Sequence, residues 1–250
     1  MKPKTPEEIA IMRECGRRLA TILNEAAAMV APGVSPKDIS KKVAEQIKKN
    51  DMQPVVLGYD GFPDVVCISV NQNIVHGVPP AAKIKDGDVV KVDLTLGYKS
   101  LICDSAVTVV AGTKTTAAVQ RLVKGTKEAL DMAIVAVKGD GTRVGDISAA
   151  AEDVMNKYKL GVIRDLVGHG LGYSIHEEPN IPNYGVAGTG PILHAGMTIA
   201  IEPMAALGDW HIIETKGPAP AIAMADGSLG AHFEHTVLIT DKGAEILTQA

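Results

Sequence analysis

The chain has few cysteines, few aromatic residues and no excess of positive charge. Its three cysteines, Cys15, Cys67 and Cys103, are far apart and lack the paired spacing of a disulfide framework or a zinc knuckle. Two phenylalanines, five tyrosines and one tryptophan offer little surface for stacking nucleic-acid bases, and a net charge of −4 does not attract phosphate backbones. We therefore expect no DNA partner.

Long hydrophobic runs are also lacking. No apolar stretch approaches the roughly 18–20 residues that a membrane span requires. The first eight residues are charged and do not have the apolar centre of a signal peptide. We expect a cytoplasmic protein without a membrane partner, because unpaired cysteines suit a reducing compartment. No heptad pattern predicts a coiled coil, so we expect a monomer.

What the chain does contain is typical of a globular protein: 250 residues, 46% of them apolar and 22% charged. Capping signals at 5–8 and 35–38 predict two opening helices, and two more are expected at about 115–137 and 145–160. Gly-, Pro- and Asn-rich sequence predicts a loop from Pro179 to Pro191. Alternating apolar patterns predict strands at 65–70, 89–96, 101–110, 197–204, 233–240 and 245–248.

The order of helices followed by strands occurs twice, which indicates an internal repeat. Gly87 precedes Asp93 by six residues, and Gly196 precedes Glu202 by the same interval, 109 positions later. The strand that contains Asp104 likewise parallels the one that contains Glu234. We predict an α/β (α+β) fold in which 1–250 form a single catalytic domain. Its two similar halves, about 1–112 and 113–250, would be related by a pseudo-twofold axis.

Four acidic residues interrupt these apolar strands, two in each half: Asp93, Asp104, Glu202 and Glu234. Carboxylates in such surroundings are expected to be at least partly buried, and four of them near one axis cannot all stay ionised without a compensating cation. No lysine or arginine pattern supplies enough positive charge. Divalent metal is therefore the expected counter-charge, and four carboxylates suggest more than one ion.

One histidine has the setting of a metal ligand. His169 stands between two glycines, which let the backbone approach a ligand closely. A site of carboxylates plus one imidazole favours Mn²⁺, Fe²⁺ or Co²⁺, with Zn²⁺ possible. His76 and His176 are candidates for acid–base groups that face the substrate. Each histidine taken alone is equally compatible with a structural role.

Several segments of the chain resemble motifs of type I methionine aminopeptidase. The match covers nearly the whole chain, and the ordered set of Asp, Asp, His, Glu and Glu, with the two aspartates eleven positions apart, is highly specific. The resemblance implies the duplicated pita-bread fold, with an antiparallel sheet core covered by helices. The segments that carry it are 5–16, 71–79, 86–104, 168–179, 197–204 and 233–240.

The resemblance also implies an activity and a set of site residues. It implies removal of the N-terminal methionine from nascent proteins, with the ribosome as a partner, by a water that two divalent ions activate. Catalytic roles would fall to His76, His176 and Glu202. The metal ligands would be Asp93, Asp104, His169, Glu202 and Glu234, with Asp104 and Glu234 bridging the ions. The methionine pocket would be lined by Val56, Tyr59, Phe62, Cys67, Val75, Ile175 and Met204.

The sequence departs from the family pattern at two places near this site. His232 replaces a glutamine two residues before Glu234, and Pro218–Ala221 occupy the region where a tryptophan precedes Asp226. Two alternatives stay open. One is a Pro-directed aminopeptidase or dipeptidase on the same scaffold, and the other is a pita-bread binding protein without catalysis.

Overall fold

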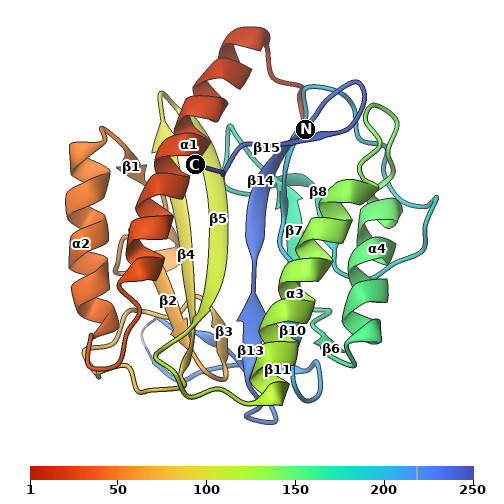
Figure 1. Ribbon diagram of the computed structural model, residues 1–250. Coiled ribbons are helices and arrows are strands. Elements are labelled where there is room, and N and C mark those ends of the chain that lie inside the picture. The colour runs from red at the N-terminus through yellow and green to blue at the C-terminus, as the bar shows by residue number, and fades with distance from the viewer. Residues whose placement is uncertain (218) are drawn as a thin grey trace.

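The computed structural model describes residues 1–217 and 219–250, in which helices cover one face of a large antiparallel sheet (Figure 1). The helices α1 and α2 lie over the first half of the chain, and α3 and α4 lie over the second. A short 3₁₀ segment, η1, stands apart from them. Their bounds are α1 Pro6–Ala28, α2 Pro36–Lys49, η1 Tyr59–Gly61, α3 Ala117–Ala136 and α4 Val144–Lys157.

The two opening helices begin where the capping signals predict. The Thr5 hydroxyl accepts a hydrogen bond from the Glu8 N–H at 3.2 Å, and the Glu8 carboxylate accepts one from the Thr5 N–H at 2.8 Å. Ser35 caps α2 through the N–H of Asp38. Each cap satisfies amide groups that the helix itself cannot, which contributes about 1 kcal/mol.

The main sheet runs in the order β1-β4-β5-β14-β9-β7-β8, with β2 added beside β4 and β15 beside β14. Two three-stranded sheets, β13-β10-β6 and β11-β12-β3, lie next to it. The strands are β1 Gln53–Pro54, β2 Cys67–Val70, β3 Asn73–Val75, β4 Val89–Tyr98, β5 Leu101–Val110, β6 Gly161–Val162, β7 Val167–Gly170, β8 Glu177–Pro182, β9 Thr198–Ile201, β10 Met204–Ala206, β11 Ile212–Glu214, β12 Ile222–Met224, β13 Gly230–His232, β14 Glu234–Ile239 and β15 Ala244–Ile246.

Each half has its own hydrophobic core beneath its helices. In the first half, Met12 and Leu19 of α1 belong to one buried cluster with Val92 and Leu94 of β4. A second cluster joins residues of α3 and α4 to β9 and β14. Because side chains alternate across a strand, Asp93, between Val92 and Leu94, lies on the opposite face from α1.

The strand register brings two more acids, Asp104 and Glu234, to that same face. Ala106 of β5 pairs with Asp93 on one side and with Glu234 on the other. Asp104 lies two residues before Ala106 and therefore points the same way. These three acids meet because the two halves join along β5 and β14.

A proline interrupts the corresponding ladder of the second half. Strand β9 pairs with β14 up to Ile201 and His235, and the same register resumes where Met204 of β10 pairs with His232 of β13. Between them Pro203 has no N–H to donate, so the ladder breaks. The continued register places Glu202 across from Glu234, where two carboxylates would repel each other without a cation.

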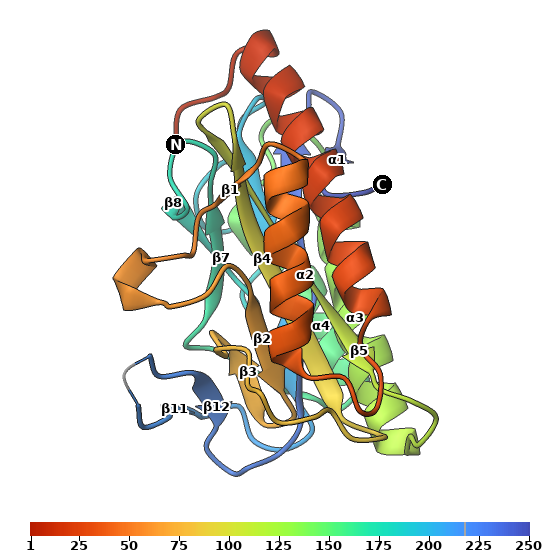
Figure 2. The same cartoon turned by 90° about the vertical axis from the view of Figure 1, so that its left-hand side faces the viewer.

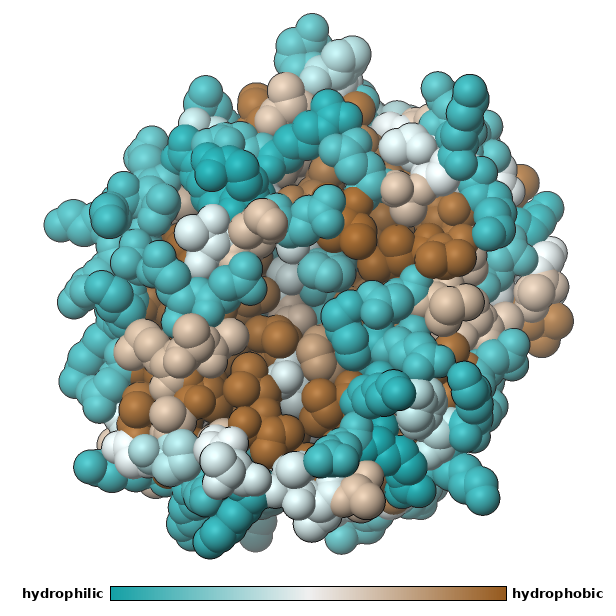
Figure 3. All heavy atoms as spheres, in the orientation of Figure 1, coloured by the Kyte–Doolittle hydropathy of each residue, from teal (hydrophilic) through white to brown (hydrophobic). Residues whose placement is uncertain are grey.

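The two sides of the sheet differ in what they present. Figure 2 shows the segment with η1 and the β11–β12 hairpin projecting from the side opposite α1. The helix-bearing face has hydrophobic residues toward its centre and hydrophilic residues around its rim (Figure 3). None of the helices in the described parts of the chain combines the length and apolarity needed to cross a membrane.

The predicted helices and most predicted strands are present, with one correction. The loop expected from Pro179 begins within strand β8, which pairs with Val167–Gly170 of β7. The sequence pattern was misleading because β8 is the last strand of the sheet order, and an edge strand tolerates proline where no partner needs its N–H.

Candidate metal centre

A cavity of about 450 Å³ opens on the face that carries the acids. Residues from both halves line it, and they include every metal-ligand, catalytic and pocket residue that the sequence suggested. The lining residues are Val56, Tyr59, Asp60, Phe62, Cys67, Val75, His76, Asp93, Thr95, Asp104, Leu166, Val167, His169, Ile175, His176, Glu202, Met204, Ala219, Pro220, His232 and Glu234.

Asp104 is held firmly in strand β5. The Thr95 hydroxyl donates to its Oδ2 at 2.9 Å, while Thr236 Oγ1 accepts from the Asp104 N–H and donates to its carbonyl, both at 2.8 Å. The other carboxylate oxygen, Oδ1, is buried and has no hydrogen-bond partner within 1–217 and 219–250. Such an atom calls for a partner, for which an ion or a water qualifies.

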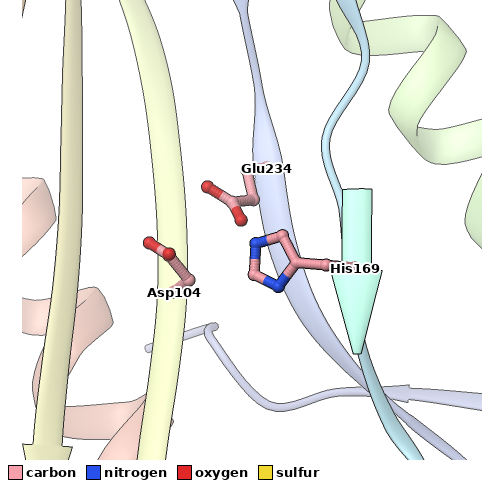
Figure 4. Close-up of side chains that lie close together, drawn as sticks. All are labelled: Asp104, His169 and Glu234. Atoms are coloured by element: carbon pink, nitrogen blue, oxygen red, sulfur yellow. The ribbon is translucent and has the colours of Figure 1, made fainter. Parts of the chain in front are cut away.

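The second half contributes His169, Glu202 and Glu234 to the same point. Figure 4 shows the side chains of Asp104, His169 and Glu234 converging from three strands, β5, β7 and β14. One ligand atom of each lies within 4.8 Å of the other two. His169 Nε2 is 3.5 Å from Glu202 Oε1. The Nδ1 atom of His169 lies 2.9 Å from the Gly170 carbonyl, so a proton on Nδ1 leaves the Nε2 lone pair free for a metal.

The electrostatics of the acids indicate missing positive charge. Burial raises the pKa of Asp93 and Glu234 well above the ordinary values, and neighbouring carboxylates, including Asp104, raise them further. Burial likewise raises the pKa of Glu202 to about 8. In the described chain their ion-pair partners are only histidines, and no lysine or arginine lies within salt-bridge distance.

The residues present therefore fit a divalent cation. Carboxylate oxygens and an imidazole nitrogen are the donors that Mn²⁺, Fe²⁺, Co²⁺ and Zn²⁺ accept in proteins. The unpartnered Asp104 Oδ1 and the mutually repelling acids are the features that a cation would satisfy.

Two further histidines stand at the cavity mouth. The Tyr59 hydroxyl lies 3.1 Å from His176 Nδ1, and the His176 ring packs edge-on against His169 with ring centres 4.5 Å apart. Burial lowers the pKa of His176 to about 4, so its imidazole is neutral at pH 7. His76 has a left-handed backbone, with φ of 57°, which is uncommon for a residue other than glycine and recurs at functional sites.

An apolar wall borders the acids. Cys67, Val75 and Met204 are buried in it, whereas Val56, Phe62 and Ile175 are partly exposed to the cavity. The wall is placed by the strands that place the acids, since Cys67 pairs with Asp93 and Met204 follows Glu202 by two residues. A cation-binding cluster and a slot for an apolar side chain thus share one cavity.

A sequence model described as "Metallopeptidase family M24" matches residues 10–241. The chain belongs to metallopeptidase family M24. This membership confirms the predicted resemblance and implies that the chain uses divalent metal.

Full-length relatives agree with this assignment. The chain is 40% identical to a methionine aminopeptidase from Mycoplasma capricolum, over 98% of this chain and 97% of the relative. It is similar to the crystal structure of a methionine aminopeptidase from Thermotoga maritima, with a TM-score of 0.96, 43% identity and complete coverage of both chains. A prolidase from Pyrococcus furiosus is more distant, with a TM-score of 0.77 and 27% identity, and this chain spans 65% of it. The predicted pita-bread fold is confirmed.

This M24 chain also has cavity residues that sequence reasoning did not select. Thr95 was detectable only as the pairing partner of Asp104, and Leu166 and Val167 lie in a segment without a motif. Ala219 and Pro220 fall where the family tryptophan is missing, and both line the cavity; Pro218 lies outside the described residues. The sequence shows His232 as a substitution, but its position beside Glu202 and Glu234 depends on the fold.

Proposed function

We propose that this chain removes the N-terminal methionine from peptides and proteins by metal-dependent hydrolysis. The chain is an M24 metallo-aminopeptidase, and its full-length relatives carry the name methionine aminopeptidase. One observation carries the proposal: a single cavity joins the acid cluster to an apolar wall that suits an unbranched thioether. A substrate whose first side chain fills the wall has its first peptide bond beside the acids.

Two divalent ions, of Mn, Fe or Co, are the proposed cofactor. Asp93, Asp104, His169, Glu202 and Glu234 would together hold the ions. When bound, such ions supply positive charge that polarises a carbonyl and lowers the pKa of water toward neutrality. The carboxylates in turn hold the ions at fixed positions on the rigid sheet.

The chain's own residues would orient the substrate. If the Tyr59 hydroxyl donates to His176 Nδ1, the proton of the neutral imidazole sits on Nε2, from which it can donate to the substrate carbonyl oxygen. His76, held in its left-handed conformation, would contact the nitrogen of the scissile bond. Glu202 would receive a proton from water and return it to the leaving amine, because its carboxylate lines the cavity in which the scissile bond would lie.

The selectivity for methionine would come from the apolar wall. The predicted pocket residues Val56, Phe62, Cys67, Val75, Ile175 and Met204 present no charge to the bound side chain, and the Tyr59 hydroxyl is directed to His176. A charged first residue would lose its hydration there without a partner, so it would be rejected by several kcal/mol.

We also propose where and on what the chain works. Its substrates would be newly made proteins, which begin with methionine, some of them still at the ribosome. The three buried cysteines carry free thiols, which suits a monomer working in a reducing cytoplasm.

An activity assay on the metal-loaded chain tests the proposal. The chain is stripped with chelator, reloaded with Mn²⁺, Fe²⁺ or Co²⁺, and given a Met-Ala-Ser peptide or an Xaa-Pro peptide. We expect release of methionine from the first peptide and at least about a hundredfold slower cleavage of the second, because proline at position two removes the N–H of the scissile bond and restricts the preceding residue.

The result separates the remaining alternatives. Faster cleavage of the Xaa-Pro peptide would establish the Pro-directed activity instead. Absence of cleavage with every metal, in a chain that binds metal, would leave the non-catalytic binding protein.

A further inference from the structure

His232 is a buried imidazole to which the proposed function gives no role. It ends strand β13, is 1% exposed and lines the same cavity as the acids. Neither of its ring nitrogens has a hydrogen-bond partner in the part of the chain that the structure describes. A buried polar group left without a partner costs about 1–3 kcal/mol, so two such atoms beside a metal site call for a ligand.

The distance from His232 to Glu202 is that of two ligands of one ion rather than that of a hydrogen bond. Its Nε2 atom lies 3.5 Å from Glu202 Oε2 and 3.8 Å from Glu234 Oε2. Hydrogen bonds between nitrogen and oxygen span about 2.7–3.2 Å. Two donor atoms that each stand about 2.0–2.2 Å from one shared ion in tetrahedral geometry are about 3.3–3.6 Å apart.

The second imidazole of the cavity has the same relation to the same acid. His169 Nε2 is 3.5 Å from Oε1 of Glu202, as His232 Nε2 is 3.5 Å from its Oε2. Glu202 thus stands between two imidazoles, each facing one of its oxygens. His232 therefore faces the same acid as His169, which belongs to the cluster of possible metal ligands.

The backbone fixes the direction of His232. A single hydroxyl, Thr108 Oγ1, accepts from the His232 N–H at 2.9 Å and donates to its carbonyl at 2.6 Å. His232 and Glu234 are two residues apart, so strand alternation directs both to the acid face. The backbone that carries the imidazole is therefore fixed from both sides of the residue.

We propose that His232 is a further ligand of the metal centre, binding through Nε2 the ion that Glu202 holds. The inference rests on the proposed function for the remaining ligands. A second imidazole makes the donor set richer in nitrogen, which favours Co²⁺, Fe²⁺ and Zn²⁺ over Mn²⁺. The glutamine that the family pattern places at this position would lack that nitrogen donor.

Metal binding by the full chain tests this ligand without any peptide. Calorimetric titration of the chelator-stripped protein with Co²⁺ compares the unaltered chain with His232→Gln. We expect the variant to bind Co²⁺ at least about tenfold more weakly, while Mn²⁺ affinity falls less. The control is His194→Gln, since His194 is exposed and bonded to Asp140, so its loss should leave the affinity unchanged.

Proton NMR of the Co²⁺-loaded chain counts the imidazoles directly. Ring protons of a histidine that binds Co²⁺ are contact-shifted far outside the ordinary range, so we expect two shifted histidines, His169 and His232. A single shifted histidine, or an unchanged Co²⁺ affinity in His232→Gln, would overturn the proposal. If the variant fails to fold, the histidine count in the unaltered chain decides. Failure of methionine release in the separate peptide assay would refute the proposed function and leave this count valid.

Discussion

The two halves of the chain hold their acids in different ways. In the first half, Asp93 and Asp104 lie within β4 and β5, which pair along all ten residues of each strand. In the second half, Glu202 follows the end of β9 and Glu234 begins β14, so both lie at the end of a ladder, next to the break at Pro203. Both cavity imidazoles close to the acids, His169 and His232, also come from the second half.

The two halves therefore contribute differently to the site: the first holds carboxylates rigidly, and the second also brings in other side chains. The unbroken hairpin supplies negative charge at fixed positions, because Asp93 and Asp104 lie inside a continuous ladder and the Thr236 hydroxyl also holds the backbone of Asp104. The interrupted ladder bends away after Glu202, which lets Met204 and His232 reach the cavity from the smaller sheet. Equivalent strands of the two halves supply the carboxylates, whereas His232 and Met204 come from the paired segments beyond the break.

Removing one acid from each half is expected to have the largest effect. Asp104→Asn and Glu234→Gln each delete a proposed metal ligand, so both should lower kcat/KM on a Met-Ala-Ser peptide by about a thousandfold or more. The same variants should raise the Tm of the metal-free chain, because burial next to other carboxylates is relieved. If one of the two variants kept most of its activity, the acid of that half would not be required, and the two halves would contribute unequally.

Asp64 is a buried acid that has a cationic partner, Lys37, and it can be compared with the acids of the cavity. Asp64 accepts hydrogen bonds from Lys37 Nζ and the Val65 N–H, each at 2.8 Å, and from the Ser40 hydroxyl. Burial alone would raise its pKa, but these bonds outweigh it and hold the pKa below the ordinary value. Its charged form therefore stabilises the fold, unlike that of the acids in the cavity.

The pH dependence follows from the direction of that shift. With the folded pKa below the unfolded value, the stabilisation is complete above the unfolded pKa of about 4 and is lost as pH falls through the folded pKa. Asp64→Asn should lower the free energy of unfolding by about 1–3 kcal/mol at pH 7, with a smaller deficit near pH 3. Urea unfolding at several pH values measures this, and a deficit that grows in acid would contradict it.

The smallest effect is expected where a surface ion pair links the halves. Arg13 of α1 donates to both oxygens of Glu245 in β15, at 2.7 and 2.8 Å. The Arg13 side chain is half exposed, so Arg13→Ala should cost at most about 1 kcal/mol, and less in high salt. Arg17→Ala is the matched control, because Arg17 bonds Glu14 within the same helix. A much larger loss for Arg13 would mean that the halves depend on this bridge.

Much of this arrangement could be predicted from the sequence, because its signals are local. Thr5 and Ser35 mark helix starts through their own hydroxyls, and the equal spacing of Gly87–Asp93 and Gly196–Glu202 reveals the repeat. Alternation alone puts Asp93 on the face opposite its apolar neighbours. Each of these signals lies within one short segment and needs no knowledge of what packs against it.

The remainder depends on pairing between distant segments. The sequence contains Pro203, but only the register of β10 with β13 shows that the break leaves Glu202 across from Glu234. The sequence shows that His232 replaces a glutamine. The backbone of His232, however, is held by Thr108, which lies 124 positions earlier in the chain. The strand at Glu177–Pro182 was hidden because its proline lies at a sheet edge.

Because the acids of the cavity have no lysine or arginine partner in the described chain, the stability of the protein depends on its supply of metal. Without cations these side chains must take up protons to remain inside, so a chain folded in a metal-starved cell gives up part of its resistance to unfolding and to proteases. Scarcity of divalent ions would then lower the amount of enzyme as well as its turnover.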